Sequence, residues 1–349
     1  MVAPLLSVQG LVKHFPLKKD VLGRGGGVVR AVDDLNFQVM AGETLGVVGE
    51  SGCGKSTTAR LLMQLIEPTA GEVMFEGKKV GSRDMPLKEY RRQVQMVFQD
   101  SYASLNPRLT IEDSVAFGPQ VHGVPAREAV ARARGLLAKV GLDPARFAER
   151  YPHELSGGQR QRVNIARALA LQPRIVILDE AVSALDKSVE AQVLNLLLDL
   201  KEEFGLTYVF ISHDLHVVRF ISDRVMVMYL GEVAEVGRTE TLFESPRHPY
   251  TKALLSSMPS MDPDRRTLVA PLAGDPPNPI DPPTGCRFHP RCARAEAVCA
   301  QTAPSRKALA LPGVTEGVAC LMYEPGSGHS AAVSATATAP IAIAIAQAA

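Results

Sequence analysis

The sequence has almost no net charge and no long apolar run. Its 349 residues include 38 basic and 37 acidic side chains, which leaves a formal net charge of +1. A charge so close to zero creates no long-range field that would attract nucleic acid, so we expect no nucleic-acid partner. Although 46% of the residues are apolar, no uninterrupted apolar run is long enough to cross a bilayer.

The amino terminus also lacks the features of a signal peptide. Residues 1–6 contain neither the basic region nor the long apolar stretch that such a peptide needs. We therefore expect the chain to stay in the cytosol. If it works at a membrane, another polypeptide must supply the spanning helices.

Cysteines are few and unevenly placed, with Cys53 alone and four near the carboxyl end: Cys286, Cys292, Cys299 and Cys320. In a cytosolic protein such a group indicates a metal or cluster site before it indicates disulfides. The spacing lacks the paired C-x2-C arrangement of common zinc ribbons. Four thiolates in a proline-rich segment suit a [4Fe–4S] cluster, while zinc and reduced thiols without metal stay open as alternatives.

A glycine-rich loop between a strand pattern and a helix pattern predicts a phosphate site. The loop Gly49–Ser56 reads Gly-Glu-Ser-Gly-Cys-Gly-Lys-Ser and follows the apolar run Thr44–Val48. Its glycines let backbone N–H groups surround a phosphate. Lys55 is expected to reach the β- and γ-phosphates of ATP, and Ser56 to hold Mg²⁺. The predicted nucleotide contacts are Gly49, Glu50, Ser51, Gly52, Cys53, Gly54, Lys55, Ser56 and Thr57, with no redox role for Cys53.

Two acidic residues end an apolar strand pattern further along the chain. Ile175–Asp179 is followed directly by Glu180, and uncompensated charge at a buried strand would be costly. We predict that Asp179 holds Mg²⁺ and that Glu180 polarises the attacking water. His213 follows the next strand pattern, at the end of a strand where ligands bind in α/β sheets, and is expected to contact the γ-phosphate.

The segment Leu155–Gln159 reads Leu-Ser-Gly-Gly-Gln and begins a helix pattern. A helix start offers backbone donors and a positive dipole end, which suit a γ-phosphate. The residues predicted to face a phosphate here are Ser156, Gly157, Gly158 and Gln159.

The order of elements predicts an α/β fold with a mainly parallel sheet, because strand and helix patterns alternate from Thr44 onward. Helical patterns rich in Ala and Arg occupy residues 111–149, and proline becomes dense after residue 246. We expect three parts: a nucleotide-binding domain (1–250), a cysteine-containing extension (251–325) and a disordered tail (326–349).

Together these motifs make the chain resemble the nucleotide-binding subunit of an ATP-binding cassette (ABC) transporter over residues 5–255. The resemblance implies a P-loop ATPase fold with an antiparallel β subdomain and a helical signature subdomain. It identifies Gly49–Ser56 as the Walker A loop, Ile175–Asp179 as Walker B and Leu155–Gln159 as the signature motif.

The same resemblance assigns individual roles. It implies that Glu180 is the catalytic glutamate, His213 the switch histidine, and Ser183–Asp186 the D-loop. Gln99 matches the glutamine that senses Mg²⁺ and the transmembrane partner, and Phe15 takes the place of the aromatic residue that stacks on adenine. In this family the signature motif faces ATP on the other subunit, so that two subunits enclose two nucleotides.

Segments near the carboxyl end resemble the extension of di- and oligopeptide importer ATPases. They are His248–Leu255 and Gly285–Cys292, and they extend the resemblance to about residues 5–325. The resemblance implies a [4Fe–4S] cluster, two multi-span permease subunits and a second ABC ATPase as heterodimer partner. It also implies an extracytoplasmic peptide-binding protein as an indirect partner. The expected location is peripheral, at the cytoplasmic face of the cell membrane.

Other functions share parts of this pattern. Nickel and glutathione importers have related extensions. ABC ATPases of DNA repair typically carry a long coiled-coil insertion between Walker A and Walker B, and ribosome-associated ABC factors carry two cassettes. This chain has one motif set and only a short helical region between the two Walker motifs, which favours the peptide-importer interpretation.

Overall fold

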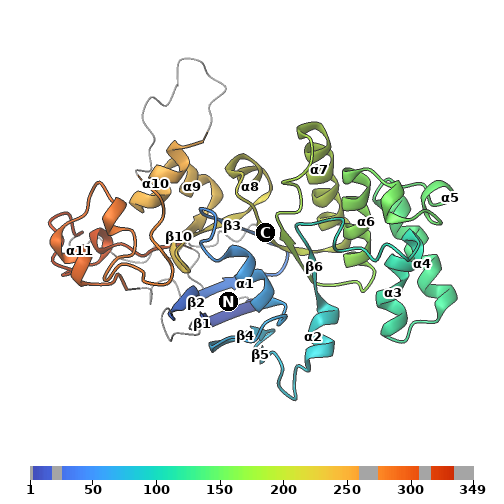
Figure 1. The fold of residues 1–349 in the computed structure, drawn as a ribbon, viewed down its shortest axis with the longest axis horizontal. Coiled ribbons are helices and arrows are strands. Elements are labelled where there is room, and N and C mark those ends of the chain that lie inside the picture. Colours follow the sequence, from blue (N-terminus) through green and yellow to red (C-terminus); the bar gives the residue numbers. More distant parts are fainter. Residues whose placement is uncertain (1–2, 18–25, 259–273, 306–315, 334–349) are drawn as a thin grey trace, which may run out of the picture.

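The computed structural model describes residues 3–17, 26–258, 274–305 and 316–333. Two sheets and a helical arm form the body of the molecule (Figure 1). The helical arm with α3, α4 and α5 lies at one end, and the carboxyl-terminal extension with α11 lies at the other. In the part of the chain that the structure describes, no helix is long and apolar enough to cross a membrane.

The larger sheet has seven strands in the order β11-β10-β9-β3-β8-β7-β6. Five neighbouring strands pair in parallel, in the order β9-β3-β8-β7-β6. At one edge of the sheet, β10 pairs antiparallel with β9, and β11 pairs antiparallel with β10. The strands are β3 (Thr44–Val48), β6 (Val94–Val97), β7 (Ile175–Asp179), β8 (Thr207–Ile211), β9 (Arg224–Tyr229), β10 (Glu232–Arg238) and β11 (Gly317–Val318).

Both faces of this sheet are buried, which explains why its parallel strands are mainly apolar. On β7, Val176 and Leu178 belong to one hydrophobic core, and Ile175 and Ile177 belong to a second core on the opposite face. Successive side chains of a strand point to opposite faces, so a continuous apolar run is what a covered parallel strand requires.

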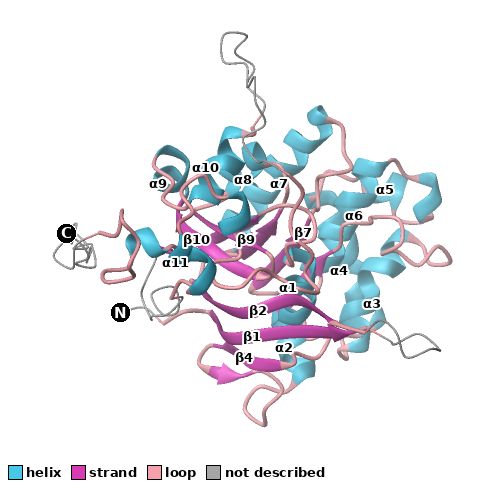
Figure 2. Cartoon of the chain, turned by 60° about the vertical axis from the view of Figure 1, so that its left-hand side comes forward, coloured by secondary structure: helices cyan, strands magenta, loops and turns pink. Residues whose placement is uncertain are grey.

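The smaller sheet is antiparallel and has the order β2-β1-β4-β5. Figure 2 shows its strands beneath α1 and beside the larger sheet. They are β1 (Leu6–Pro16), β2 (Val28–Val39), β4 (Ala70–Phe75) and β5 (Lys78–Lys79). β1 and β2 pair along most of their length, from Leu6 opposite Val39 to Pro16 opposite Val28.

Helices cover both faces of the larger sheet and build the arm. The arm contains α3 (Ile111–Val121), α4 (Ala126–Lys139), α5 (Pro144–Phe147) and α6 (Gly157–Leu169). The other helices are α1 (Lys55–Leu62), α2 (Leu87–Gln93), α7 (Lys187–Phe204), α8 (Leu215–Ile221), α9 (Thr239–Glu244), α10 (Pro249–Ser256) and α11 (Ala297–Gln301). The mainly parallel core sheet, antiparallel β subdomain and helical subdomain of the predicted fold are confirmed.

The predicted tail, 326–349, lies largely outside the described residues. Residues 326–333 are described, and His329 is buried there with its Nε2 atom 3.0 Å from the carbonyl oxygen of Arg294. The extension is joined to the core sheet because β11 pairs with β10.

Candidate nucleotide site

The loop between β3 and α1 has a backbone that only glycine can adopt at two positions. Gly49 has φ +151°, and a Cβ atom there would lie 2.2 Å from the carbonyl oxygen of Met228. Gly54 has φ +108°, and its Cβ would lie 2.3 Å from the carbonyl oxygen of Ala31. A side chain at either position would therefore collide with neighbouring strands and open the loop.

The two residues after the loop begin α1 and present polar groups toward it. Lys55 Nζ donates hydrogen bonds to the carbonyl oxygens of Gly49 (2.7 Å) and Glu50 (3.1 Å). Ser56 Oγ donates to Asp179 Oδ1 over 3.1 Å. Burial raises the pKa of Asp179, and the hydrogen bond from Ser56 opposes that rise only in part.

Three further side chains meet beyond the ends of neighbouring parallel strands. Gln99 follows β6, Glu180 follows β7 and His213 follows β8. Gln99 Nε2 donates to Glu180 Oε2 over 2.7 Å, and His213 Nδ1 lies 3.5 Å from the same oxygen. Because the carboxyl ends of parallel strands share one edge, residues far apart in sequence are brought to one point.

These groups surround a single cavity of about 920 Å³, including open solvent. Its lining residues are Val29, Ala31, Ser51, Gly52, Gly54, Lys55, Ser56, Thr57, Gln99, Glu180, His213 and Pro279. Most of the predicted phosphate-loop residues and the three strand-end residues thus share one space. The side chain of Asp179 is buried, and it is connected to this cavity by its hydrogen bond with Ser56, which lines the wall.

The cavity wall includes residues that were not predicted and lacks several predicted nucleotide contacts: Phe15, Gly49, Glu50 and Cys53. Val29, Ala31 and Pro279 line it, and no motif marks them. Phe15 is not among the lining residues, although it pairs across the small sheet with Val29. The Phe15 ring instead lies beneath Lys13, with Nζ 5.1 Å from the ring centroid.

The signature segment lies apart from this cavity, at the start of α6. Ser156 Oγ accepts a hydrogen bond from the N–H of Gln159 (3.3 Å), and Gln159 Oε1 accepts one from the N–H of Ser156 (2.9 Å). This reciprocal pair is a capping box that fixes the helix start. Ser156 and Gly157 are exposed, so their polar groups are open to a ligand held by another molecule.

The four carboxyl-terminal cysteines converge on one pocket in the extension. It is lined in part by Cys286, Cys292, Cys299 and Cys320, together with His248, His289 and His329. Burial raises the pKa of Cys286 to about 12 and that of Cys320 to about 11, which favours protonated thiols at neutral pH. Within the described ranges, no group of three or more His, Cys, Asp or Glu residues could hold a metal ion. The geometry as described does not fit the predicted [4Fe–4S] cluster, which is left without structural support.

The phosphate loop, the acidic strand end and the strand-end histidine around one cavity define a P-loop ATPase domain. Comparison with known families agrees. The ABC transporter model matches residues 32–183, and the model for the carboxyl-terminal region of oligopeptide/dipeptide transporters matches residues 234–299.

Curated relatives match most of the chain. A probable peptide ABC transporter ATP-binding protein of Sinorhizobium fredii is 50% identical over 96% of this chain and 94% of its own length. The oligopeptide transport ATP-binding protein AppF of Bacillus subtilis is 48% identical over 91% and 97%. The dipeptide transport ATP-binding protein DppF of Haemophilus influenzae is 51% identical over 86% and 92%.

Solved structures give the same result for the fold. CbiO1 from Clostridium perfringens, part of an ABC transporter complex, is 27% identical with a TM-score of 0.59 and covers 70% of this chain and 92% of its own. A dimeric ATP-binding cassette bound to ADP and Pi is 32% identical with a TM-score of 0.59, covering 67% and 98%. The chain belongs to the ABC transporter family of ATP-binding proteins, in the group with the oligopeptide/dipeptide transporter extension.

Proposed function

We propose that this protein is the ATP-hydrolysing subunit of an importer for dipeptides or oligopeptides. The observation that carries the proposal is the presence of both parts in one chain. An ATPase cavity lies in the cassette, and the extension matches the family model of oligopeptide/dipeptide transporters. Relatives about half identical over most of both chains bear names of peptide, oligopeptide and dipeptide transport.

The geometry supports a division of labour around Mg-ATP. Lys55 neutralises the β- and γ-phosphates, and the phosphate loop supplies N–H donors. Ser56, Asp179 and Gln99 would hold Mg²⁺ through the oxygen ligands that this ion prefers, and the ion would supply positive charge to balance that on the phosphates.

The same arrangement provides for attack by water. In this proposal Glu180 orients and polarises the attacking water, and the contacts of its carboxylate with Gln99 and His213 at the cavity wall support this role. His213 is placed to contact the γ-phosphate and to stabilise charge in the transition state.

A second subunit completes the site in this proposal. The donors of Ser156, Gly157, Gly158 and Gln159 face ATP bound to the Walker A loop of the partner ATPase. ATP then holds the two subunits together, and hydrolysis releases them. ATP favours the closed state only to the extent that it binds the closed state more tightly than the open state.

The proposal extends to partners and parts of the chain. We infer that a related ATPase forms a heterodimer with this chain, and that two multi-span permease subunits receive it at the cytoplasmic face of the membrane. An extracytoplasmic binding protein delivers the peptide. Residues 1–250 serve as the cassette and residues 251–325 as the extension.

Co-purification from membranes tests this function. The tagged protein is extracted in mild detergent, and its partners are identified by mass spectrometry. We expect two permease subunits and a second cassette ATPase. A purely soluble set of partners, such as ribosomal or DNA-repair proteins, would contradict the transport role and leave the ATPase activity standing.

The contents of the cysteine pocket need a separate test. If the four cysteines hold a [4Fe–4S] cluster, anaerobically purified protein is brown, contains iron and shows broad visible absorption that fades in air. A colourless, iron-free anaerobic sample would contradict the cluster, and stoichiometric zinc in that sample would favour the zinc alternative.

A further inference from the structure

The extension contacts the Walker A loop directly through one arginine. Arg291 Nη1 donates to Glu50 Oε2 over 2.7 Å, and Nη2 donates to Glu50 Oε1 over 3.0 Å. The side chain of Arg291 is only 6% exposed and that of Glu50 is 21% exposed. A paired arrangement of this kind is among the stronger and more specific hydrogen-bonding geometries in proteins.

Glu50 is held at three points, each by a different part of the molecule. Its carboxylate is bound by Arg291 of the extension, and its N–H donates to the hydroxyl oxygen of Tyr250 on α10 over 2.9 Å. Its carbonyl oxygen accepts from Lys55 Nζ over 3.1 Å. The position of this loop residue therefore depends on the extension and on α10 as well as on the cassette.

An aromatic cluster supports this contact from behind. The rings of Tyr229, Tyr250 and Phe288 lie with centroids 4.6–5.3 Å apart. Arg291 Nη1 also donates to the Tyr229 hydroxyl over 3.3 Å. Phe288 comes from the extension and the two tyrosines from β9 and α10, so burial of the cluster holds the extension against the loop.

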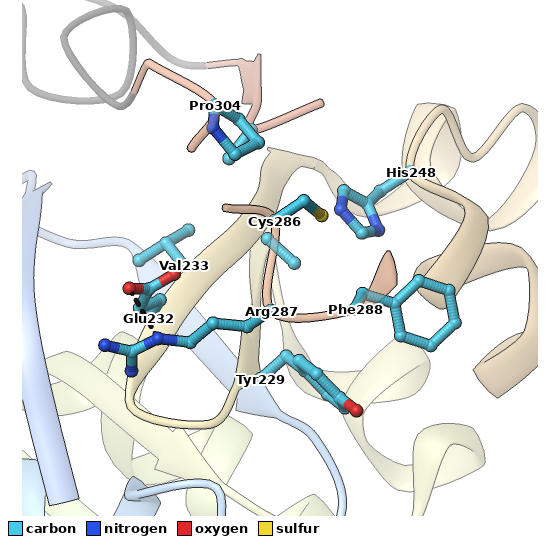
Figure 3. Close-up of a pocket in the computed structure, with 10 residues that line it drawn as sticks. Tyr229, Glu232, Val233, His248, Cys286, Arg287, Phe288 and Pro304 are labelled. Atoms are coloured by element: carbon cyan, nitrogen blue, oxygen red, sulfur yellow. Dashed lines mark ion pairs between the residues drawn. The ribbon is translucent and has the colours of Figure 1, made fainter. Parts of the chain in front are cut away.

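A second arginine fixes the extension nearby. Arg287 Nε pairs with Glu232 Oε1 over 2.9 Å, and its guanidinium also binds Asp33 and the carbonyl oxygen of Leu230. Figure 3 shows Arg287 extended toward Glu232, with Tyr229 and Phe288 on the adjoining wall. Arg287 is 8% exposed, and it joins the extension to β2 and to the turn between β9 and β10.

The charge of Glu50 explains why such a contact is needed. Glu50 immediately precedes Ser51 and Gly52, which line the nucleotide cavity. A free carboxylate at this place would repel the phosphates of ATP, and a repulsion of this kind is strong where water is partly excluded. Arg291 balances the charge of this carboxylate, and Glu50 is not among the residues that line the cavity.

We propose that Arg291 of the carboxyl-terminal extension is a positioning residue for ATP binding. Arg291 neutralises the charge of Glu50 and holds the Walker A loop in the conformation that binds ATP. The inference rests on the proposed ATPase function and adds to it that the extension takes part in nucleotide binding. ATP affinity is thereby coupled to the docking of the extension.

A double-mutant cycle on the full-length protein tests the proposal. The dissociation constant of a fluorescent ATP analogue, and KM and kcat for ATP, are measured for wild type, Arg291→Ala, Glu50→Gln and the double variant. We expect Arg291→Ala to weaken binding and raise KM about tenfold, with a smaller change in kcat, as for loss of one charged hydrogen-bonded pair. In the Glu50→Gln background the same substitution should change binding less than about twofold, because no carboxylate is left to neutralise.

Arg294→Ala is the matched control, since it removes a positive charge three residues away in the same segment. Arg294 contacts its neighbours through its backbone, by an N–H bond to Cys292 Sγ and a carbonyl contact to His329. Its substitution should leave the dissociation constant within about twofold of wild type.

Two results would overturn the inference. One is unchanged ATP binding in Arg291→Ala, and the other is an equal loss in both backgrounds, which would mean that Arg291 acts only by keeping the extension folded. If Arg291→Ala does not fold, Arg291→Lys carries the same cycle, because it keeps the charge and loses the paired geometry. A wild-type protein that neither binds nor hydrolyses ATP would contradict the proposed function itself.

Discussion

Glu180 occupies an unusual backbone position at the centre of the site. Its φ of +49° lies in the left-handed region, which is uncommon for residues other than glycine and often marks functional strain. Its N–H donates to the carbonyl oxygen of Ile211 over 2.9 Å. The neighbouring strand therefore holds this conformation and directs the carboxylate toward Gln99 and His213.

Glu180→Gln should bind Mg-ATP normally and hydrolyse it at least about 100-fold more slowly, as expected for loss of a general base. The amide keeps the shape of the side chain and cannot accept the proton of water. Single-turnover hydrolysis and analogue binding are measured side by side. Near-normal turnover would remove Glu180 from its proposed role.

Asp179 illustrates a conflict between function and stability. Burial raises its pKa, so the ionised form that Mg²⁺ binding needs is unfavourable in the folded protein without nucleotide. For a carboxyl whose folded pKa is raised, the contribution to stability is complete below the unfolded pKa and is lost as pH rises through the folded value.

Asp179→Asn should therefore raise the thermal midpoint of the nucleotide-free protein at pH 7 and abolish ATP turnover. The gain should vanish toward pH 4, where Asp179 of the wild type becomes protonated. Thermal unfolding followed from pH 4 to pH 7 measures both effects. A lower midpoint at pH 7 would show that the interactions of the ionised carboxylate outweigh its burial.

At the scale of elements, the extension is held to the cassette by buried ion pairs and by the pairing of β11 with β10. Arg287 contacts Asp33 on β2 and Glu232 on β10. Burial raises the pKa of Asp33, but hydrogen bonding and attraction from Arg287 outweigh this effect, so that the pKa lies below its usual value.

Arg287→Ala should lower the free energy of unfolding by about 3 kcal/mol, because it removes the buried guanidinium that pairs with Asp33 and Glu232. Arg294→Ala serves again as the control. Because the pKa of Asp33 is lowered, the stability from this pair is present above its unfolded pKa and lost as pH falls through the folded value. The difference between variant and wild type should thus shrink below about pH 4, and an unchanged midpoint at pH 7 would contradict the structural role.

At the scale of the whole molecule, the two features predicted to bind phosphate are separated within one chain. The cavity is lined by the Walker A loop and strand-end residues, while Ser156 lies exposed at the start of α6 on the helical arm. A single copy cannot bring both to one nucleotide without a large rearrangement. Two copies, or a pair of related ATPases, can do so by facing each other.

Ser156→Arg should keep ATP binding at its own Walker A loop and lose ATP-dependent association with the partner ATPase, because the bulky cation blocks the helix start that faces the partner. Glu180→Gln alone should form a long-lived dimer with ATP because hydrolysis is slowed, and adding Ser156→Arg should prevent that dimer, as measured by size-exclusion chromatography. A variant that still forms this dimer would contradict the head-to-tail arrangement.

Much of the site can be predicted because its chemistry lies in short contiguous segments. Gly49–Ser56 and Ile175–Glu180 show their strand, loop and helix settings locally, and the structure places five residues of the first segment and Glu180 of the second around one cavity. Phe15 was assigned to adenine stacking from the family resemblance and stays a prediction. It lies near the end of β1, paired with Val29, and Val29 rather than Phe15 is among the residues that line the cavity.

The sequence by itself determined the cassette fold, the phosphate loop and the ATPase class, since glycines, strand-end acids and apolar periodicity act over a few residues. Only the tertiary structure decided that Arg291 meets Glu50 across 241 positions and that Pro279 reaches the nucleotide cavity. Pairing between distant segments depends on the path of the whole chain and on the surfaces that packing brings together, and no local pattern encodes that path.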